Sequence, residues 1–441
     1  MAVNLYLRAP GEKRRPSSRL DAVIHLDEPG VQGYPLHHNL RELWATPPPA
    51  GREVSAFLLA ALGVWAADKL VPRRGARDAW TRELTLHLPL SPPLSRLGPG
   101  LEAGLGFLTG DDWTLKIREA QVDLGLAGVW PHSWRPQGVV LFSGGLDSLV
   151  GAIDLLEEGQ RLVLISHYDF GQLASTQQAL AAALAGYHGP GRLHHLALRV
   201  QFPEAPELTL RSRSLLYLAL GLAAAAAFGP DTPLTIPENG WISLNPPLTG
   251  NRLGTYSTRT THPYFLGQLT AWWRAAGLAN PLINPYQSLT KGELLSQCRN
   301  PDLLKRLFSL TTSCARPVAS RWRGLSAGAC GYCYPCLMRR AALNRLGWDE
   351  GPHYLLDVLA GPENLNHRTR GRDLRALLLA LKTWEETPQE IVARLHLGEP
   401  GPDLPHRFAA ARQILTHGFK EIAQFFQEKG PGWLKSFGGW G

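Results

Sequence analysis

In the middle of the chain, short continuous apolar runs alternate with longer segments in which apolar residues recur at helical spacing. Short apolar runs typical of buried strands occur at residues 139–142, 162–167, 193–200, 234–237 and 282–284. Each run is followed by apolar residues at helical spacing, at residues 148–158, 173–187, 210–228, 263–278 and 291–298. Such alternation predicts an α/β fold in which helices cover both faces of a parallel sheet. Because ligands of these sheets bind beyond the carboxyl ends of the strands, the residues that follow each strand are the candidates for a site.

The two ends of the chain follow other patterns. Strands are predicted at residues 3–8, 22–27, 82–90 and 113–119 and a helix at 52–70, with proline-rich stretches at 47–49 and 89–93. After residue 347 only helices are predicted, at 354–359, 373–383, 388–395 and 408–429. We therefore expect an N-terminal α/β accessory domain (1–134), a central domain (135–346) that follows a linker at 130–136, and a helical C-terminal region (347–441).

The 441 residues are 44% hydrophobic and 19% charged, which is typical of a soluble globular protein. The formal net charge of +8 suits an anionic ligand such as ATP. It permits a nucleic-acid partner but does not require one, since no block of like charge stands out. The longest apolar runs, 56–67 and 215–228, are too short to span a membrane, and residues 1–10 lack the pattern of a signal peptide. We therefore expect a cytoplasmic protein without a membrane partner.

The strongest local signal is the turn Ser143-Gly144-Gly145-Leu146-Asp147-Ser148, between the strand predicted at 139–142 and the helix after it. Its glycines let the backbone approach a ligand closely, and its N–H groups and the start of the helix favour a phosphate. Ser143 and Ser148 add hydroxyl donors, whereas Asp147 suits a phosphate only when Mg²⁺ or a ligand donor lies between them. The turn lacks the lysine of a Walker loop. We predict that residues 143–148 bind a nucleotide; an ordinary glycine turn is the alternative.

Two groups that follow the next strands are candidates for further contacts with the nucleotide. His167, with Tyr168 beside it, ends the second strand, where the adenosine would lie; a histidine that only caps the strand is an equal alternative. Arg211 and Arg213 open the long helix after the third strand. Residues two apart on a helix face different directions, so at most one of these arginines is expected to reach a phosphate. The alternative is that both are solvated.

Two polar stretches are candidates for the substrate. Glu238 and Asn239 follow the fourth strand, where a carboxylate and an amide can contact the edge of a ring; an Asn-Gly turn is the alternative. Arg259, Thr261 and His262 lie in a stretch dense in hydrogen-bond donors ahead of a helix, which favours an anion or substrate loop. For Thr261 the alternative is the N-cap of that helix. We expect both stretches to bind the substrate.

Lys291 completes the predicted catalytic pair with Asp147. It begins the helix after the fifth strand, and the spacing of Thr290 and Glu293 around it predicts a capping box. A lysine at this place can reach a phosphate; a solvated lysine at the start of the helix is the alternative.

The cysteines give the second strong signal. Cys314, Cys330, Cys333 and Cys336 are grouped, and the spacing of the last three suits a tight knuckle around one tetrahedral ion. In a cytosolic enzyme such a group favours a metal over disulfides. We predict a closed, structural zinc site. Cys298 is a spare candidate for it and is expected instead to be a buried thiol.

These motifs together resemble a known family. Residues 143–148 match the PP-loop signature of enzymes that form an acyl-adenylate and release pyrophosphate. The chain has this turn, the arginines at 211–213, the stretch 289–293 and four cysteines ahead of residues 339–342 in the same order as QueC, 7-cyano-7-deazaguanine synthase. The resemblance covers roughly residues 137–346. It implies a Rossmann-like PP-loop (HUP-type) fold with a four-cysteine zinc site, and ATP-dependent activation of 7-carboxy-7-deazaguanine followed by amide formation and dehydration to the nitrile.

Two features depart from that family. QueC has no counterpart of residues 1–134 or of the helical tail, and its first zinc spacing is shorter. The stretches 237–240 and 257–263 resemble the QatC-type proteins of bacterial anti-phage (Qat) systems. That resemblance implies a shared activation step with a different acceptor, in which the deazaguanine amide is joined to a partner protein that the added domains would hold.

The leading hypothesis is therefore an adenylating ligase that forms a C–N bond and releases AMP and pyrophosphate. It implies ATP, Mg²⁺ and Zn²⁺ as cofactors, a deazaguanine-type small molecule as substrate, and a partner protein of a defence operon as acceptor. One alternative is a tRNA-modifying PP-loop enzyme that adenylates a base. Another is a non-catalytic, zinc-bearing scaffold of a defence complex.

Overall fold

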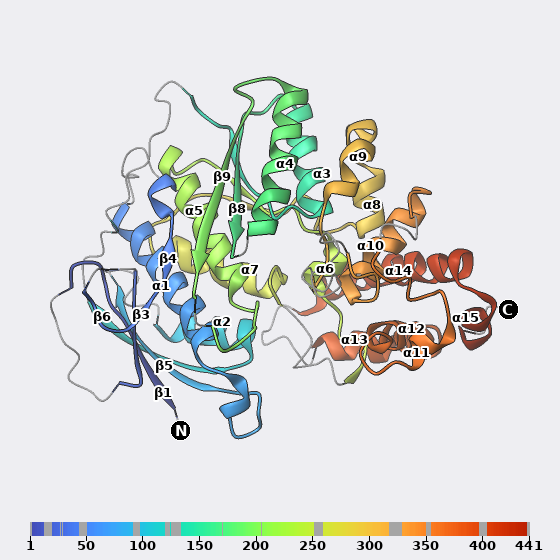
Figure 1. Cartoon of the computed structure of the whole chain (residues 1–441), viewed down its shortest axis with the longest axis horizontal. Helices are drawn as coiled ribbons and strands as arrows, with labels where there is room; N and C mark the ends of the chain where they lie inside the picture. The colour runs from blue at the N-terminus through green and yellow to red at the C-terminus, as the bar shows by residue number, and fades with distance from the viewer. Residues whose placement is uncertain are drawn as a thin grey trace. The chain divides into compact units, whose positions relative to one another are not determined.

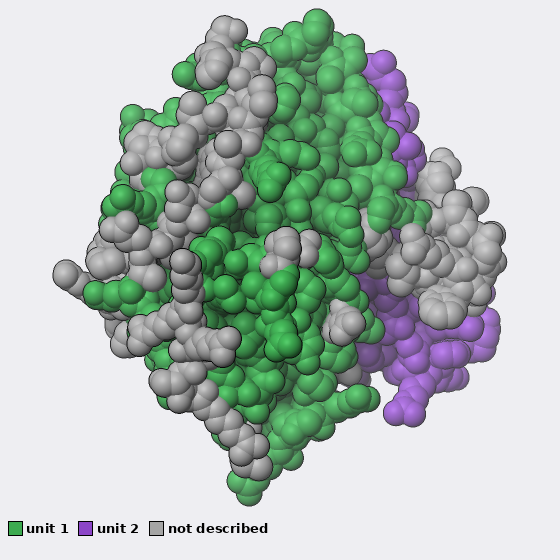
Figure 2. All heavy atoms as spheres, turned by 60° about the vertical axis from the view of Figure 1, so that its left-hand side comes forward, with its two compact units in different colours: residues 1–143, 158–236, 258–283 green, residues 144–157, 237–257, 284–441 purple. Residues whose placement is uncertain are grey.

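The structure is a computed structural model of the whole chain (Figure 1), and it forms two compact units (Figure 2). Unit 1 comprises Met1–Ser143, Glu158–Ile236 and Thr258–Ile283; unit 2 comprises Gly144–Glu157, Pro237–Ser257 and Asn284–Gly441. The structure describes residues 2–12, 20–26, 28, 30–43, 51–90, 98–119, 124, 134–169, 171–203, 205–250, 259–316, 329–349, 354–396 and 404–438. Three predicted segments lie wholly or partly outside these ranges: the proline-rich stretch at 47–49, residues 91–93 of the stretch at 89–93, and most of the linker at 130–136. Ser257 and Thr258 also lie outside them. Pro89 is described and lies within a strand, so there it does not separate two elements.

The N-terminal part of unit 1 contains its own parallel sheet, in the order β3-β2-β1-β5-β6. The strands are β1 (Val3–Leu7), β2 (Ala22–His25), β3 (Tyr34–Pro35), β5 (Glu83–Leu90) and β6 (Asp112–Glu119). Helices α1 (Gly51–Leu70) and α2 (Gly98–Thr109) connect the later strands. The α/β prediction for this region is confirmed, and α2 is a helix that the sequence analysis did not predict.

The second sheet of unit 1 has the order β11-β10-β7-β8-β9-β4. Its strands are β7 (Gly138–Leu141), β8 (Leu162–Tyr168), β9 (Leu193–Gln201), β10 (Leu234–Thr235), β11 (Leu282–Ile283) and the short β4 (His37–His38). All pairs are parallel except β4 on β9. The chain passes from β7 outward through β8 to β9 and then continues on the other side with β10. Residues that leave β7 and β10 therefore start at the point where the strand order reverses, which is the usual ligand position in such sheets.

The two sheets of unit 1 share one hydrophobic core. Helix α1 contacts both β5 of the first sheet and α5 (Arg213–Phe228), which packs on β7 and β8 of the second. Because α1 is covered on all sides, it is apolar around its whole circumference, from Val54 to Ala67. That explains the long apolar run at 56–67. None of the helices in the described ranges is both long enough and apolar enough to cross a bilayer. The domain boundaries at residues 134 and 346 stay a prediction.

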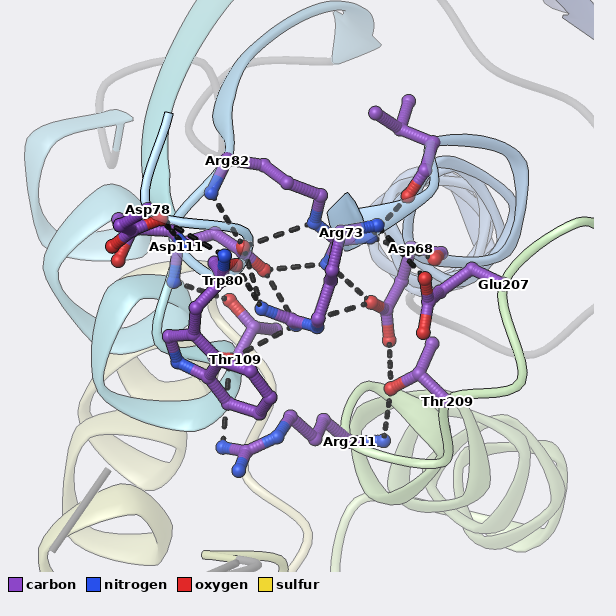
Figure 3. A network of polar contacts seen from close by, with 12 residues as sticks. Asp68, Arg73, Asp78, Trp80, Arg82, Thr109, Asp111, Glu207, Thr209 and Arg211 are labelled. Atoms are coloured by element: carbon purple, nitrogen blue, oxygen red, sulfur yellow. Dashed lines mark hydrogen bonds and ion pairs between the residues drawn. The ribbon is translucent and has the colours of Figure 1, made fainter. Parts of the chain in front are cut away.

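A buried charge network joins the N-terminal region to α5 (Figure 3). Arg73 and Arg82 both bind Asp111, with Arg73 Nη1–Asp111 Oδ1 at 2.9 Å and Arg82 Nη2–Asp111 Oδ2 at 2.6 Å. Arg82 also binds Asp68 at 2.5 Å. The second Asp68 oxygen accepts hydrogen bonds from the backbone N–H and the hydroxyl of Ser212, at 3.2 and 2.6 Å. A carboxylate at the end of α1 thus satisfies the first turn of α5.

We expect Asp111→Ala to lower the free energy of unfolding by about 3–5 kcal/mol, because it leaves two buried guanidinium groups without their shared carboxylate. The exposed neighbour Asp112 provides the matched control, and Asp112→Ala should leave stability nearly unchanged. Urea unfolding of the two variants measures the difference. Equal stabilities would show that the network contributes nothing.

Unit 2 is mainly helical. Its helices are α3 (Leu146–Glu157), α6 (Gly240–Leu244), α8 (Lys291–Ser296), α9 (Pro301–Leu307), α10 (Tyr334–Arg345), α11 (Pro362–Asn366), α12 (Arg372–Glu386), α13 (Pro388–His396), α14 (Leu404–Lys429) and α15 (Gly432–Gly438). Helix α14 packs against α6, α10 and α12 around a core that includes Trp241, Leu337 and Phe419. The helix predicted at 354–359 is wrong: Tyr354 forms a β-bridge with Ala329, and the residues after it are turns. The other C-terminal helix predictions are confirmed.

Candidate active site and metal centre

The turn at 143–148 connects β7 to α3 as the sequence predicts, with Leu146 as the first residue of the helix. Gly144 has a φ of +82°, a conformation that a residue with a side chain rarely adopts. The backbone N–H of Thr312 donates to the carbonyl of Gly144 at 3.0 Å, and the Ser148 hydroxyl donates back to the carbonyl of Gly145 at 3.0 Å. The turn is therefore held from within and by the segment that precedes the cysteine cluster.

Asp147 lies at the centre of a compact polar cluster in unit 2. Its Oδ1 accepts a hydrogen bond from the ammonium of Lys291, and both side chains are buried. Its Oδ2 accepts from the backbone N–H of Asn239 at 3.1 Å and from Nδ2 of the same residue at 2.6 Å. The carboxyl group of Glu238, the residue before Asn239, interacts electrostatically with Asp147. The structure thus brings together four residues that the sequence analysis selected from three distant stretches of the chain.

Helix caps fix the backbone of the two segments whose side chains contact Asp147. Asn239 is the N-cap of α6, where its Oδ1 accepts from Ile242 N at 3.0 Å, so the Asn-Gly pair begins a helix rather than a turn. Thr290 and Glu293 form the predicted capping box of α8. The backbone N–H of Gly240 donates to the carbonyl of Leu289 at 2.8 Å. This bond joins the segment with Asn239 to the segment with Lys291.

The two carboxyl groups of the cluster have pKa values shifted in opposite directions. Burial alone raises the pKa of Asp147, but the Lys291 ammonium and hydrogen bonds from Lys291, Asn239 and Glu238 outweigh it, and the net pKa is lowered. Burial and then the charge of Asp147 raise the pKa of Glu238 well above its usual value. The pair therefore holds one negative charge, on Asp147, and Glu238 keeps a proton at pH values where an ordinary glutamate has lost it.

We expect Glu238→Gln to remove a pH-dependent loss of stability. Since the folded-state pKa of Glu238 is raised, folding favours its protonated form; stability falls as pH rises above the ordinary pKa of glutamate, and levels off above the raised one. The slope contributed by this one proton is at most about 1.4 kcal/mol per pH unit. Urea unfolding at several pH values should show a shallower slope in the variant over that range. Parallel curves for the two proteins would contradict the assignment.

His167, Arg211 and Arg213 belong to unit 1 and have partners there. His167 is fully buried: its Nδ1 accepts from Arg213 Nε at 3.2 Å, and its Nε2 donates to the carbonyl of Val200 at 3.2 Å. Burial lowers the pKa of His167 to about 3, so the ring is neutral. Arg211 stacks on Trp80 with 4.8 Å between guanidinium and ring, beside the network of Figure 3. Nucleotide contacts by these three residues stay a prediction.

The second stretch selected for the substrate also lies in unit 1. Arg259 donates to the carbonyl of Phe107 at 3.0 Å, and its guanidinium lies 4.3 Å from the centre of that ring. The N-cap of α7 (Pro263–Ala275) is His262, whose Nδ1 accepts from Tyr264 N at 3.3 Å; it is not Thr261, which was the expected alternative. Thr261 is buried. Substrate binding by Arg259, Thr261 and His262 stays a prediction.

The cysteines at 314, 330, 333 and 336 form a cluster whose sulfur atoms all lie within 4.8 Å of one another. The sulfurs of Cys314 and Cys333 are 3.9 Å apart, and those of Cys330 and Cys336 are 3.8 Å apart. Thiolates bound tetrahedrally to zinc at their usual bond length lie about 3.8 Å from one another. The cluster therefore fits zinc, with its four positions filled by sulfur. Cys298 is a buried thiol outside it, as expected.

Two residues that the sequence analysis did not assign link this metal centre to the turn. Arg339, one helical turn after Cys336 on α10, donates to the hydroxyl of Thr311 at 2.6 Å and to the carbonyl of Phe308 at 2.8 Å. Thr312, next to Thr311, is the residue that holds the carbonyl of Gly144. The two arginines after the last cysteine were visible in the sequence, but the pattern gave no sign of which partner each would bind.

Part of the chain is similar to a characterised protein. It is 26% identical to 7-cyano-7-deazaguanine synthase of Parasynechococcus marenigrum (strain WH8102) over 235 residues, which cover 47% of this chain and 93% of that protein. No family model and no solved structure matches the chain. The homology supports a QueC-like family for about half of the chain.

Proposed function

We propose that the protein is an ATP-dependent enzyme that activates the carboxylate of a 7-deazaguanine, such as 7-carboxy-7-deazaguanine, as an acyl-adenylate. The observation that carries the proposal is the cluster of Asp147, Lys291, Asn239 and Glu238 at the start of α3. It lies directly after a glycine turn that suits a phosphate. Homology to 7-cyano-7-deazaguanine synthase supports this class of substrate.

The charges of the cluster residues suit the negative charge that develops on the leaving pyrophosphate. The carboxylate attacks the α-phosphorus of ATP, the bond from that phosphorus to the β-phosphate oxygen breaks, and pyrophosphate leaves with the electron pair. Lys291 supplies a buried positive charge beside the turn, where it stabilises the leaving pyrophosphate in the transition state. Asp147 holds that ammonium in place. Positioning and electrostatics provide the catalysis, and no covalent protein intermediate is needed.

Asp147 and Glu238 are the residues that would hold Mg²⁺. The two carboxyl groups interact, and Glu238 would release its proton when the ion binds; both would then supply carboxylate oxygens, the donors that suit Mg²⁺. When bound, the ion would neutralise part of the phosphate charge. The cysteine cluster, whose positions are all filled by sulfur, would hold zinc in a structural role.

The second half of the reaction transfers the acyl group to an amine. The amine nitrogen attacks the acyl carbon, the bond from that carbon to the oxygen of AMP breaks, and AMP leaves while the nitrogen loses a proton. We further propose that this amine belongs to a partner protein. This more specific proposal is based on the resemblance to the QatC-type proteins of anti-phage systems. The N-terminal sheet and the C-terminal helices would then provide its binding surfaces.

Incubation of the purified protein with ATP, Mg²⁺ and 7-carboxy-7-deazaguanine tests the proposal. Ammonium serves as the acceptor, and nucleotide products are separated by chromatography. We expect AMP and pyrophosphate in equal amounts, dependent on the deazaguanine. Formation of ADP and phosphate would refute adenylation. AMP formation that requires added tRNA and is lost after RNase treatment would refute the small-molecule substrate.

A further inference from the structure

Helix α14 forms hydrogen bonds with the short segment 290–293, which carries Lys291. The carboxylate of Glu421 on this helix is buried, and its Oε2 accepts a hydrogen bond from the hydroxyl of Thr290 at 2.7 Å. The backbone N–H of Gly292 donates to the same carboxylate, at 3.2 Å from Oε1 and 3.1 Å from Oε2. Glu421 therefore holds the residue before Lys291 and the residue after it.

Helix α14 and the segment 290–293 pack closely at Gly292. A Cβ atom placed on Gly292 would lie 2.3 Å from Oε2 of Glu421, so only glycine lets the carboxylate come this close. One helical turn earlier, His417 Nδ1 lies 2.9 Å from Oε1 of Glu293, the acidic member of the capping box. The first turn of α8 is thus held by its own cap and by two residues of α14.

The same helix contacts the other segment that binds Asp147. Phe419 packs edge-on against Trp241 of α6, with 5.0 Å between ring centres, and a Cβ on Gly418 would lie 2.0 Å from the Trp241 ring. A Cβ on Gly240 would lie 2.8 Å from Ile414. Helix α14 therefore lies against the residues next to Asn239 as well as those next to Lys291.

We propose that Glu421 is a positioning residue of the active site, which sets the ammonium of Lys291 against Asp147 by holding the backbone on both sides of it. The proposal rests on the proposed function for its catalytic meaning, but the placement of Lys291 can be measured without it. It gives the C-terminal helical region a direct part in the reaction. Hydrogen bonds to a buried carboxylate are strong and directional, so the loss of this one side chain loosens the segment, although its capping box and His417 remain.

Glu428 provides the matched control. It lies on α14 two turns after Glu421 and ties this helix to α10 through Asn344 Nδ2, at 2.7 Å. It does not touch the segment 290–293 in the described structure. If the only role of Glu421 were to dock α14, then Glu428→Ala and Glu421→Ala would have similar effects.

The experiment is acetylation of lysines by limiting acetic anhydride, with the extent at each lysine measured by mass spectrometry. Lys305, which is exposed on α9, serves as the internal reference. We expect acetylation of Lys291 to rise on the order of tenfold in Glu421→Ala, to rise less in Glu421→Gln, which retains an acceptor for Gly292, and to stay unchanged in Glu428→Ala. No rise in Glu421→Ala, or an equal rise in Glu428→Ala, would overturn the proposal.

Steady-state kinetics of the same variants give the second measurement and separate the two proposals. We expect kcat to fall about tenfold in Glu421→Ala with little change in KM for ATP, since Lys291 acts mainly on the leaving pyrophosphate. The isosteric Glu421→Gln keeps the test open if the alanine variant does not fold. A wild-type protein that releases no pyrophosphate but shows the expected labelling pattern would refute the proposed function alone. An active wild type whose Lys291 labelling is unaffected by both Glu421 variants would refute the positioning role alone.

Discussion

Asp147→Ala is expected to lower pyrophosphate release from ATP by about a thousandfold or more, because it removes the group around which the site is organised. Without this carboxylate the Lys291 ammonium loses its buried partner, and the Asn239 amide and the Glu238 carboxyl group lose theirs. A discontinuous assay of pyrophosphate at saturating ATP and 7-carboxy-7-deazaguanine measures the change.

Asp154→Asn is the control for this experiment. Asp154 is a second buried aspartate on α3, and it binds the Tyr286 hydroxyl at 2.7 Å and the backbone N–H of Arg299 at 2.8 Å. The substitution disturbs the same helix without touching the cluster, so activity should stay within a few-fold of the wild type. A similar loss in both variants would mean that the effect of Asp147→Ala comes from the fold of α3 rather than from chemistry.

Removal of the metal is expected to have the largest effect on stability. Zinc bound by four thiolates contributes about 10 kcal/mol to the folding of its site, so Cys336→Ser should lose the metal and the cooperative unfolding of unit 2. The effect should extend to the turn, because Arg339 and Thr312 connect the cysteine cluster to Gly144. Elemental analysis by plasma mass spectrometry and thermal unfolding of the purified variant measure the two losses.

Cys298→Ser separates metal binding from the general loss of a cysteine. Cys298 is buried, as are Cys330, Cys333 and Cys336, but it lies outside the cluster. This variant should keep one zinc per chain and nearly the stability of the wild type. A wild-type protein that binds no zinc, or a Cys298→Ser variant that loses it, would contradict the assignment of the site.

Much of the fold follows from local patterns. Strands β7 and β8 of the second sheet are buried on both faces, so their apolar runs are continuous and their positions are predicted closely from the sequence. Helices with strong amphipathic or capping signals, such as α12 and α8, are also found at the expected residues. The prediction at 354–359 failed because Tyr354 pairs with Ala329, a contact that no local pattern encodes.

The candidate site likewise contains some residues that local sequence patterns predict and others that they do not. Asp147, Lys291 and the four cysteines stand in motifs with fixed spacing. The structure brings Asp147 and Lys291 into contact and groups the cysteines, while their roles in catalysis and metal binding stay a prediction. Glu421 was not found because its partners are far away in the sequence. A signal was present nevertheless: Glu421 lies on the apolar stripe of α14, between Gly418 and Phe425, where a charged residue needs a buried partner.

Arg211 has partners in the structure that its position in the sequence did not indicate. Its place at the start of a predicted helix favours a phosphate contact. In the structure its guanidinium lies on Trp80, beside a network of buried charges. Burial and the neighbouring charge of Arg73 lower its pKa to about 10. The spacing along a helix shows which direction an arginine faces, but not what it contacts there. It therefore does not distinguish a contact with the N-terminal region from a contact with a ligand.

Transfer of ¹⁸O from the substrate tests the central claim most directly. The protein is given 7-carboxy-7-deazaguanine with an ¹⁸O-labelled carboxylate, ATP, Mg²⁺ and ammonium, and the AMP is analysed by mass spectrometry. Attack of the carboxylate on the α-phosphorus and later cleavage of the acyl–oxygen bond leave one labelled oxygen on AMP, which is the result that we predict. Unlabelled AMP, or label found in inorganic phosphate beside ADP, would show that the carboxylate is not activated as an adenylate.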